Sequence, residues 1–417
     1  MSAVRSALFT GGAHASKVLM GFILLKVMAV YLGPEGVGKL GHLMSVVSVL
    51  TILSGGGIIN ALVKYCSEYH QTPRKLLRFI SAAVTYALLF SLLVCIAGIV
   101  LSRSLSLFVF GVDDYQSIII LLAIAQLALA FANVVFGVTN GLRVTHVFAY
   151  SQILGNVLAV PLLWFCISRY LEYGAGVSIV LASSLCALPA LYFYRRSPFW
   201  GRIRLFKIDG LSFRQLFAYT TMLVVSTLAF PLVEITVRSM LISQVGYHDA
   251  GIWQAAIRFS AAYLGFFTMF LAFYFVPRIS PEQNSTVVVK MTLRHLYLVQ
   301  AIFVLGAGTL YLGRTFFIKL IFSEEFSPLA DLIIYQLLGD FFKISAYVIG
   351  FIAVAKAATK LYIIAEVLQG GLFLLGAWLM SRAQVGVESV MQAYVVTYIL
   401  YFVICLIGLR VYMRKQR

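Results

Sequence analysis

The chain has 417 residues, of which 61% are hydrophobic and 11% are charged, and its formal net charge is +17. A soluble domain carries about 25% charged residues, so the composition excludes a water-soluble globule and indicates an integral membrane protein. The longest polar connections, 195–213 and 278–291, leave no room for a catalytic domain outside the membrane, which argues against an enzyme.

Long apolar runs recur from one end of the chain to the other. A run of about 20 apolar residues can cross the bilayer as a helix, so the runs predict an all-α membrane protein. The first run follows Arg5 without a convincing small-residue cleavage site, and we interpret it as a membrane span and not as a signal peptide. The sequence predicts twelve transmembrane helices, at residues 10–31, 40–63, 78–101, 115–139, 147–169, 173–194, 214–240, 250–277, 292–312, 330–356, 360–381 and 388–410.

Most lysines and arginines lie in the two tails and in the connections that follow an even number of spans. Arg74, Lys75 and Arg195 are examples, whereas the other connections hold few basic residues, such as Lys39 and Arg103. By the positive-inside rule this asymmetry predicts a multi-pass protein with both termini in the cytoplasm. The basic charge therefore sets the topology, and we expect no nucleic-acid partner.

Metal and nucleotide motifs are missing from the sequence. The five cysteines are scattered without a C-x-x-C pair, and the six histidines form no cluster with metal-ligand spacing. We therefore expect no metal, disulfide framework or cofactor. The phosphate-binding pattern G-x4-G-K-[ST] does not occur either, so nothing supports direct drive by ATP.

Three short patterns recur about 213 residues apart. The first is G-x4-G, the second is a pair of acids between aromatic residues, and the third sets Gln152 opposite Glu366. Three matches in order at nearly one offset predict an internal duplication. The matched segments are GPEGVG (33–38) with GYHDAG (246–251), FGVDDY (110–115) with FSEEF (322–326), and SQILGN (151–156) with AEVLQG (365–370).

The repeat offset contains six spans, so both halves cross the membrane in the same sense. We predict an N-lobe at 1–194, a basic cytoplasmic linker at 195–213 and a C-lobe at 214–417. In transporters built from parallel repeats, the substrate path lies between the two lobes, and one lobe rocks against the other for alternating access.

Eight charged residues lie inside the predicted spans. A charge at the bilayer centre costs about 2.5–3.5 kcal/mol on insertion scales, so most of the eight must face a wetted interior or one another. They are Lys17, Lys26, Glu234, Arg238, Arg258, Asp340, Lys343 and Glu366.

Helical spacing divides these charges into pairs. Glu234 and Arg238 are four residues apart and Asp340 and Lys343 three apart, so each pair shares a helix face and forms either a structural ion pair or part of a site. Arg258, like Lys26, lies toward the outer end of its span and could instead extend to the headgroups.

The other basic candidates are the two lysines of the first span and three residues at the ends of helices. Lys17 and Lys26 are nine residues apart, on opposite sides of a straight helix unless it bends at Gly21. Basic groups on helices of both lobes suit a diphosphate, because arginine pairs with its oxygens and lysine adds a point charge. Lys64, Arg143 and Lys356 end helices on the cytoplasmic side, where a topogenic role is the simpler explanation.

Glu366 is the single acid of an apolar run, LYIIAEVLQG (361–370), and Gln369 shares its helix face. The sequence leaves two interpretations open. Glu366 is either a structural acid satisfied by a lysine or tyrosine, or a protonatable group that responds to substrate. Together with Asp340 it forms the basis of a hypothesis of coupling to protons or membrane potential.

Several segments resemble the Wzx-type lipid-linked oligosaccharide flippases of the multidrug/oligosaccharidyl-lipid/polysaccharide exporter superfamily. Residues 26–38, KVMAVYLGPEGVG, are similar to the K-x-x-A-x-x-x-G-P-x-G-x-G start of those proteins, and 335–369 is the most specific block. The similarity spreads over nearly the whole chain. It is greatest to the branch that flips the enterobacterial common antigen lipid intermediate, lipid III, with O-antigen unit flippases as near relatives.

The resemblance implies two six-helix lobes forming a V around a central cavity. It implies a flippase that moves an undecaprenyl-diphosphate-linked glycan from the cytoplasmic to the periplasmic leaflet of a bacterial inner membrane. A polysaccharide polymerase and a chain-length regulator, besides membrane lipids, are then candidate partners. The residues that match the branch are Lys17, Lys26, Lys64, Arg238, Asp340, Lys343, Lys356 and Glu366, whereas Glu234 and Arg258 depart from it.

Two other functions are less compatible with the residues. A drug or cation antiporter of the same superfamily would need a net acidic cavity, and the charges inside the predicted spans are net basic. A membrane enzyme of polysaccharide synthesis, such as a polymerase, would need a large periplasmic loop or a nucleotide-sugar motif, and the sequence contains neither.

Overall fold

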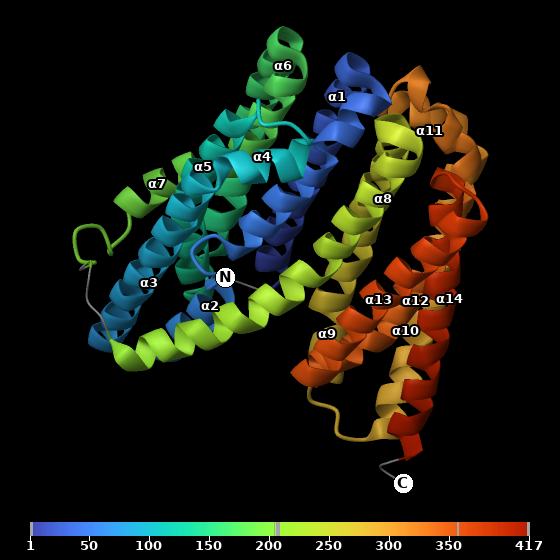
Figure 1. Cartoon of the computed structure of the whole chain (residues 1–417). Coiled ribbons are helices and arrows are strands. Elements are labelled where there is room, and N and C mark those ends of the chain that lie inside the picture. The colour runs from blue at the N-terminus through green and yellow to red at the C-terminus, as the bar shows by residue number, and fades with distance from the viewer. Residues whose placement is uncertain (1–2, 204, 206–208, 357, 415–417) are drawn as a thin grey trace. The chain divides into compact units, whose positions relative to one another are not determined.

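The computed structural model describes residues 3–203, 205, 209–356 and 358–414, and every regular element in these ranges is a helix (Figure 1). The longer helices follow the apolar runs, and short ones lie in connections. The elements are α1 (Ala3–Leu53), α2 (Ile59–Tyr69), α3 (Pro73–Val100), α4 (Ser102–Phe110), α5 (Gln116–Gly141), α6 (Thr145–Ser184), α7 (Ala187–Arg195), α8 (Gly210–Phe270), the π-helix η1 (Leu271–Phe275), α9 (Val276–Ile279), α10 (Ser285–Leu312), α11 (Arg314–Ile321), the 3₁₀-helix η2 (Glu324–Phe326), α12 (Pro328–Ala355), α13 (Thr359–Ala383) and α14 (Val387–Arg414).

Nine helical segments in the described part of the chain are long and apolar enough to cross a membrane. Three of them are interrupted by one residue with non-helical backbone angles, Gly33 in α1, Leu171 in α6 and Gly246 in α8. Each interruption divides a long helix into two apolar segments. The described helices are therefore consistent with the twelve predicted crossings.

The predicted duplication is also present in the order of the helices. Helices α3 and α10 each have 28 residues and begin 212 residues apart. The short helices α4 and α11 follow them, and α5 and α12 then begin 212 residues apart. Hydropathy did not predict α4 or α11, because each is too short to cross a bilayer.

The chain forms two compact units by the contacts within it. Unit 1 is Met1–Tyr31 with His42–Pro231, and unit 2 is Leu32–Gly41 with Leu232–Arg417. Two helices therefore contribute to both units: α1 gives its middle to unit 2, and α8 gives its first part to unit 1. The predicted lobe boundaries, at 1–194 and 214–417, describe the sequence repeat and stay predictions.

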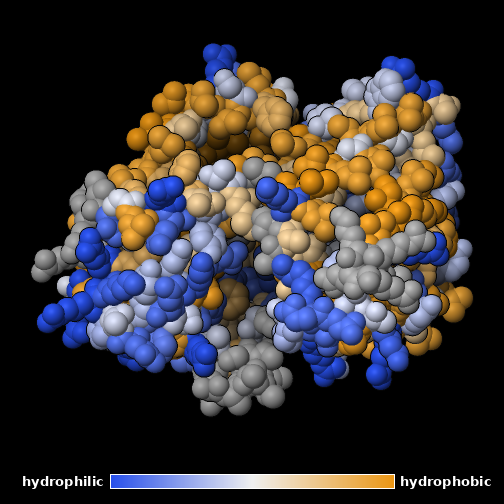
Figure 2. Space-filling model, turned by 90° about the horizontal axis from the view of Figure 1, so that it is seen from below, coloured by the Kyte–Doolittle hydropathy of each residue, from blue (hydrophilic) through white to orange (hydrophobic). Residues whose placement is uncertain are grey.

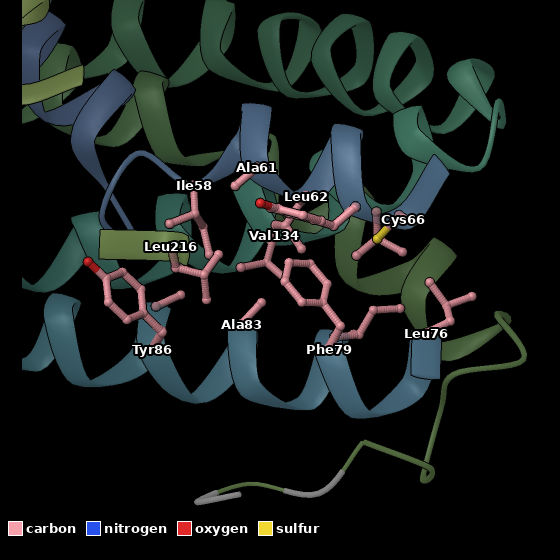
Figure 3. Packing of buried hydrophobic residues seen from close by; sticks show 14 of the residues in the cluster. Ile58, Ala61, Leu62, Cys66, Leu76, Phe79, Ala83, Tyr86, Val134 and Leu216 are labelled. Carbon is pink, nitrogen blue, oxygen red and sulfur yellow. The ribbon is translucent and has the colours of Figure 1, made fainter. Parts of the chain in front are cut away.

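Residues from four helices of unit 1 form an apolar core, shown in Figure 3. Leu62 and Cys66 of α2 pack with Phe79 of α3, Val134 of α5 and Leu216 of α8. Arg78 of α3 forms an ion pair at 3.0 Å with Asp209, the residue before α8. The hydrogen bond from Ser212 and the charge of Arg78 lower the pKa of Asp209. These contacts fix residues 209–216 on unit 1.

A break between α1 and α2 interrupts the predicted span 40–63. Gly55, Gly56 and Gly57 all have positive φ, between 65° and 81°, which glycine adopts without the steric cost of a Cβ. Side chains of other helices bind the freed backbone groups: Ser91 Oγ accepts from Gly55 N at 3.2 Å, and Thr220 Oγ1 donates to Gly56 O at 2.6 Å. Non-helical backbone at membrane depth requires such partners.

The two G-x4-G motifs cross each other within unit 2. Gly33 (φ 62°, ψ −170°) and Gly246 (φ 85°, ψ −177°) adopt the same conformation. A Cβ on Gly38 would lie 2.1 Å from Tyr247 O, and a Cβ on Gly251 would lie 1.8 Å from Pro34 O. The contact is reciprocal, because Pro34 and Tyr247 follow the first glycine of each motif. We call it the glycine crossing.

Hydrophilic residues gather over the lower part of the view in Figure 2, and hydrophobic residues cover much of its upper part. Many hydrophobic side chains are also exposed along the helices, including Leu93, Leu305 and Leu312. Exposed apolar flanks and polar ends are what a helical membrane protein presents to lipid and water.

Candidate functional site

Polar side chains of α8, α12, α13 and α14 meet inside unit 2. Arg238 is fully buried, and its Nη2 donates to Gln254 Oε1 at 2.5 Å. Its guanidinium also lies 5.7 Å from the centre of the Trp253 ring. A Cβ on Gly41 would lie 2.5 Å from Arg238 Nε, so only glycine leaves room for this arginine beside α1.

The structure brings Glu234 together with two arginines. Glu234 is within electrostatic reach of Arg238, its predicted partner four residues away, and also of Arg258. Arg258 is half-buried, and among the described residues its Nε has no hydrogen-bond partner. The alternative that Arg258 extends to the headgroups is therefore weakened, because its charge faces an internal acid.

Asp340 of α12 is fully buried and accepts hydrogen bonds from two other helices, α8 and α14, and from α12 itself. Ser260 Oγ donates to it at 2.6 Å, Tyr394 Oη donates at 2.6 Å, and Tyr263 Oη donates as well. Gln336 Nε2, one turn earlier on α12, donates at 3.3 Å. Four donors satisfy a carboxylate that burial would otherwise destabilise.

Tyr394 lies between Asp340 and its predicted partner Lys343. Lys343 Nζ donates to Tyr394 Oη at 3.2 Å, and Tyr394 in turn donates to Asp340. The ammonium is also 5.0 Å from the centre of the Tyr398 ring and 6.0 Å from that of Tyr347, distances at which a cation is attracted to the ring face. A tyrosine therefore links the two charges.

Glu366 is half-buried and faces this cluster. Its carboxylate is hydrogen-bonded to Tyr362, one turn earlier on α13, and lies within electrostatic reach of Lys343. Gln369, on the same face of α13, is buried and hydrogen-bonded to Tyr347 of α12. Glu366 thus has one hydroxyl partner where Asp340 has three and an amide.

Sequence reasoning missed the hydroxyl groups that hold Asp340. Tyr394, Tyr398 and Tyr401 follow one another at helical spacing on α14, and all three are buried. This stripe was visible in the sequence, but a row of aromatics at such spacing is more often packing than part of a polar network. Trp253, which could stack on a sugar, is instead buried against Phe373.

We expect Tyr394→Phe to lower the melting temperature of the purified protein, because it removes the bond to Asp340 and the link to Lys343. Hydrogen bonds to charged groups contribute about 1.5–3 kcal/mol each. The matched control is Tyr398→Phe, one turn away. Its hydroxyl is fully buried and has no partner within the described part of the chain, so its loss is expected to be neutral or stabilising. Equal effects of the two changes would contradict the network.

The predicted site residues of unit 1 are all basic. Lys17 is exposed on α1, within electrostatic reach of His14 and Cys186. Lys26 is half-buried on the same helix, which has helical backbone angles through Gly21. The bend that would bring both lysines to one face is not present, so they project from opposite sides of α1.

The three basic candidates at helix ends have different surroundings. Lys64 of α2 is exposed, lies 4.9 Å from the centre of the Tyr65 ring and is hydrogen-bonded to Tyr219. Arg143 is exposed after α5 and has a left-handed φ of 61°. Lys356 instead donates to the carbonyls of Ser280 and Glu282, which ties the end of α12 to the segment after α9.

The two units therefore offer different chemistry. Among the candidates inside the helices of unit 2, three cations (Arg238, Arg258 and Lys343) stand near three acids (Glu234, Asp340 and Glu366). The candidates of unit 1 include no acid. Across the residues that the structure describes, no group of three His, Cys, Asp or Glu side chains could hold a metal ion.

Known proteins match both the sequence and the fold. A family model described as "Polysaccharide biosynthesis protein" matches residues 3–283. The lipid III flippases of Escherichia coli (strain K12) and Shigella flexneri are each 31% identical to this chain over 416 residues, covering 97% of this chain and 97% of their own length.

Solved structures share the fold at low sequence identity. An inward-facing multidrug resistance MATE family transporter of the MOP superfamily has a TM-score of 0.78 at 13% identity, covering 97% of this chain and 96% of its own. The lipid II flippase MurJ in an inward closed conformation has a TM-score of 0.75 at 15% identity, covering 98% and 87%. These likenesses confirm the predicted fold class, an all-helical membrane protein with two lobes.

Proposed function

Because this chain belongs to the polysaccharide biosynthesis protein family, as a Wzx-type flippase, we propose that it moves a lipid-linked oligosaccharide across the membrane. The proposal rests on relatives named lipid III flippase, which are 31% identical to this chain in alignments that cover 97% of it. It is a multi-pass transporter and not an enzyme. The substrate is an oligosaccharide on undecaprenyl diphosphate, and the lipid III glycan or an O-antigen unit is the first candidate.

The charges of the two units support different roles, with substrate binding by unit 1 and a structural role for the charges of unit 2. Glu234, Asp340 and Glu366 balance the cations inside unit 2, whereas the candidates of unit 1 are basic without exception. Basic residues among Lys17, Lys26, Lys64 and Arg143 then contact the diphosphate, since ammonium and guanidinium groups form charge-assisted bonds with its oxygens; Lys17 and Lys26, on opposite sides of α1, do not do so together. The buried network of Arg238, Arg258 and Lys343 keeps unit 2 rigid while the substrate moves.

The resemblance to Wzx-type flippases supports movement of the headgroup from the cytoplasmic to the periplasmic leaflet. The positive-inside asymmetry supports cytoplasmic termini in a bacterial inner membrane, so the headgroup enters from the cytoplasm. Alternating access between the two lobes exposes it to the periplasm while the prenyl chain stays in lipid. A polysaccharide polymerase and a chain-length regulator would then act on the product.

Removing single cations of unit 1 tests the proposal. In proteoliposomes with a labelled undecaprenyl-diphosphate-linked oligosaccharide, Lys17→Gln and Lys64→Gln are each expected to weaken apparent affinity about ten- to hundredfold, the value of one hydrogen bond to a charged group. Arg410→Gln, an exposed arginine on the last helix, is the control for charge alone. Unchanged flipping in both lysine variants would contradict the diphosphate site, and a protein that moves no such lipid would overturn the function.

Glu366 is the acid that we assign to coupling. One hydroxyl bond holds it, and it faces Lys343, so a proton can bind without breaking a larger network. We expect Glu366→Gln to keep the melting temperature of the native protein but to lose the response of flipping to an imposed proton gradient. A Glu366→Gln protein with the native gradient response would reject this assignment, and Asp331→Asn, which neutralises an exposed acid in the first turn of α12, is the control for loss of charge.

A drug antiporter of the same fold is the competing function. The solved multidrug transporters share the fold at 13% identity, which is too low to carry their substrate to this chain. Export of cationic drugs by cells that express the protein, with no transport of the labelled lipid, would favour that class instead.

A further inference from the structure

Unit 1 contains an apolar groove that the proposed function does not use. Its volume is about 630 Å³, within the range of about 300–1,000 Å³ that is typical of ligand pockets. Helices α3 and α5 form its walls, and α7 with the segment after it covers one side. We call it the α3–α5 groove.

The groove has the depth of one lipid leaflet. On α3 it runs from Ile80 to Leu92, and on α5 from Leu127 to Leu142. At 1.5 Å per residue these stretches are about 18 and 22 Å long, somewhat more than half of a hydrocarbon core that is about 30 Å thick. The groove therefore extends from the end of α5 to about the middle of the membrane.

Basic and aromatic residues lie at the end of the groove that is farther from the middle of the membrane, and we call them the rim. Arg196 and His146 are among the lining residues. The guanidinium of Arg196 lies 4.4 Å from the centre of the Tyr192 ring, and that of Arg195 lies 5.8 Å from the Trp200 ring. Trp200 is exposed, as aromatic residues at a membrane interface are.

The segment that forms the rim is internally hydrogen-bonded. Ser197 Oγ donates to Tyr194 O at 2.7 Å and accepts from Phe199 N at 3.3 Å. Tyr194 also makes edge contacts with Phe131 of α5 and with Trp200. These contacts order the segment that contains Arg196, a lining residue of the α3–α5 groove, on the side that the positive-inside rule assigns to the cytoplasm.

We propose that the α3–α5 groove holds one acyl chain of an anionic phospholipid, whose phosphate lies at Arg196. Basic pockets between transmembrane helices on the cytoplasmic side are known to suit anionic lipid headgroups. The lining includes one arginine and one histidine, which suit the single charge of a phosphodiester. A groove of one leaflet's depth also fits an acyl chain, whereas a polyprenyl chain is much longer.

A photo-crosslinking amino acid at Phe131, which lines the groove, identifies the occupant. The full chain is reconstituted in vesicles of phosphatidylcholine with a minor share of phosphatidylglycerol and a trace of polyprenyl phosphate, and the adducts are weighed by mass spectrometry. The same amino acid at Leu93, an exposed position of α3, reports the bulk lipid. We expect phosphatidylglycerol adducts at Phe131 to be enriched about fivefold over those at Leu93. This factor corresponds to the attraction of about 1 kcal/mol between one basic residue and anionic lipid.

Two variants make the result specific. Arg196→Gln should return the adducts at Phe131 to the bulk composition, and Arg74→Gln, an exposed arginine outside the groove, should not. Val84→Phe, on a lining residue of α3, should reduce all adducts at Phe131. Bulk composition at Phe131 in the native sequence, or adducts dominated by polyprenyl phosphate, would overturn the proposal.

Discussion

Replacing Gly251 with alanine is expected to abolish flipping and to lower the melting temperature. The added Cβ would lie 1.8 Å from Pro34 O and 2.6 Å from its carbonyl carbon, so the glycine crossing must move apart. Backbone atoms cannot yield as a flexible side chain does, and overpacking typically costs about 1–3 kcal/mol or more. Flipping in proteoliposomes and thermal unfolding of the purified protein measure the two effects.

Gly350→Ala is the matched control. It adds the same methyl group within a helix of unit 2, but nothing lies within 4 Å of the new Cβ. Alanine is the better helix former by roughly 0.5–1 kcal/mol, so this variant should be as stable as the native protein or more so. If Gly251→Ala and Gly350→Ala had the same melting temperature and activity, the crossing would not be a close backbone contact.

The second large effect is expected from Asp340→Leu. Three hydroxyl groups and an amide would lose their acceptor, and Lys343 would lose the acid to which Tyr394 links it. Removing one partner of a buried charge pair costs about 3–5 kcal/mol. We expect little folded protein in the membrane. Size-exclusion chromatography in detergent and thermal unfolding measure this loss.

A double variant separates the charge from the hydrogen bonds. Asp340→Leu with Lys343→Met removes both charges, and replacing a buried ion pair with apolar residues is often neutral. We expect this protein to recover part of the lost stability but no transport. If the double variant were as unstable as Asp340→Leu, the uncompensated lysine would not be the cause.

Features with a local cause could be predicted from the sequence. Hydropathy predicts the apolar crossings, because each needs only its own run of residues, and the glycines of 33–38 and 246–251 predict the repeat. The charged pairs of α8 and α12 were also visible, because three or four residues always share a helix face. Glu366 is expected to face the interior, since lipid would leave it without a partner, and in the structure it is half-buried.

The partners of those charges depend on how helices are rotated against one another. Asp340 is bonded to Ser260, 80 residues away, and to Tyr394, 54 residues away. No hydropathy pattern specifies which of several buried hydroxyl groups turns toward the acid. The sequence left two alternatives open for Arg258, the interior and the lipid headgroups, and its electrostatic contact with Glu234 depends on the same packing.

The division of α1 and α8 between the two units has a mechanical consequence. The backbone passes from one unit to the other three times, after Tyr31, Gly41 and Pro231. When two segments are joined by a short stretch of the same chain, their association is intramolecular. Each segment then has an effective concentration near the other in the millimolar range. The connections after Tyr31 and Gly41 therefore keep residues 33–38 close to residues 246–251 within unit 2, so that the glycine crossing need not hold the middle of α1 there by its own affinity alone.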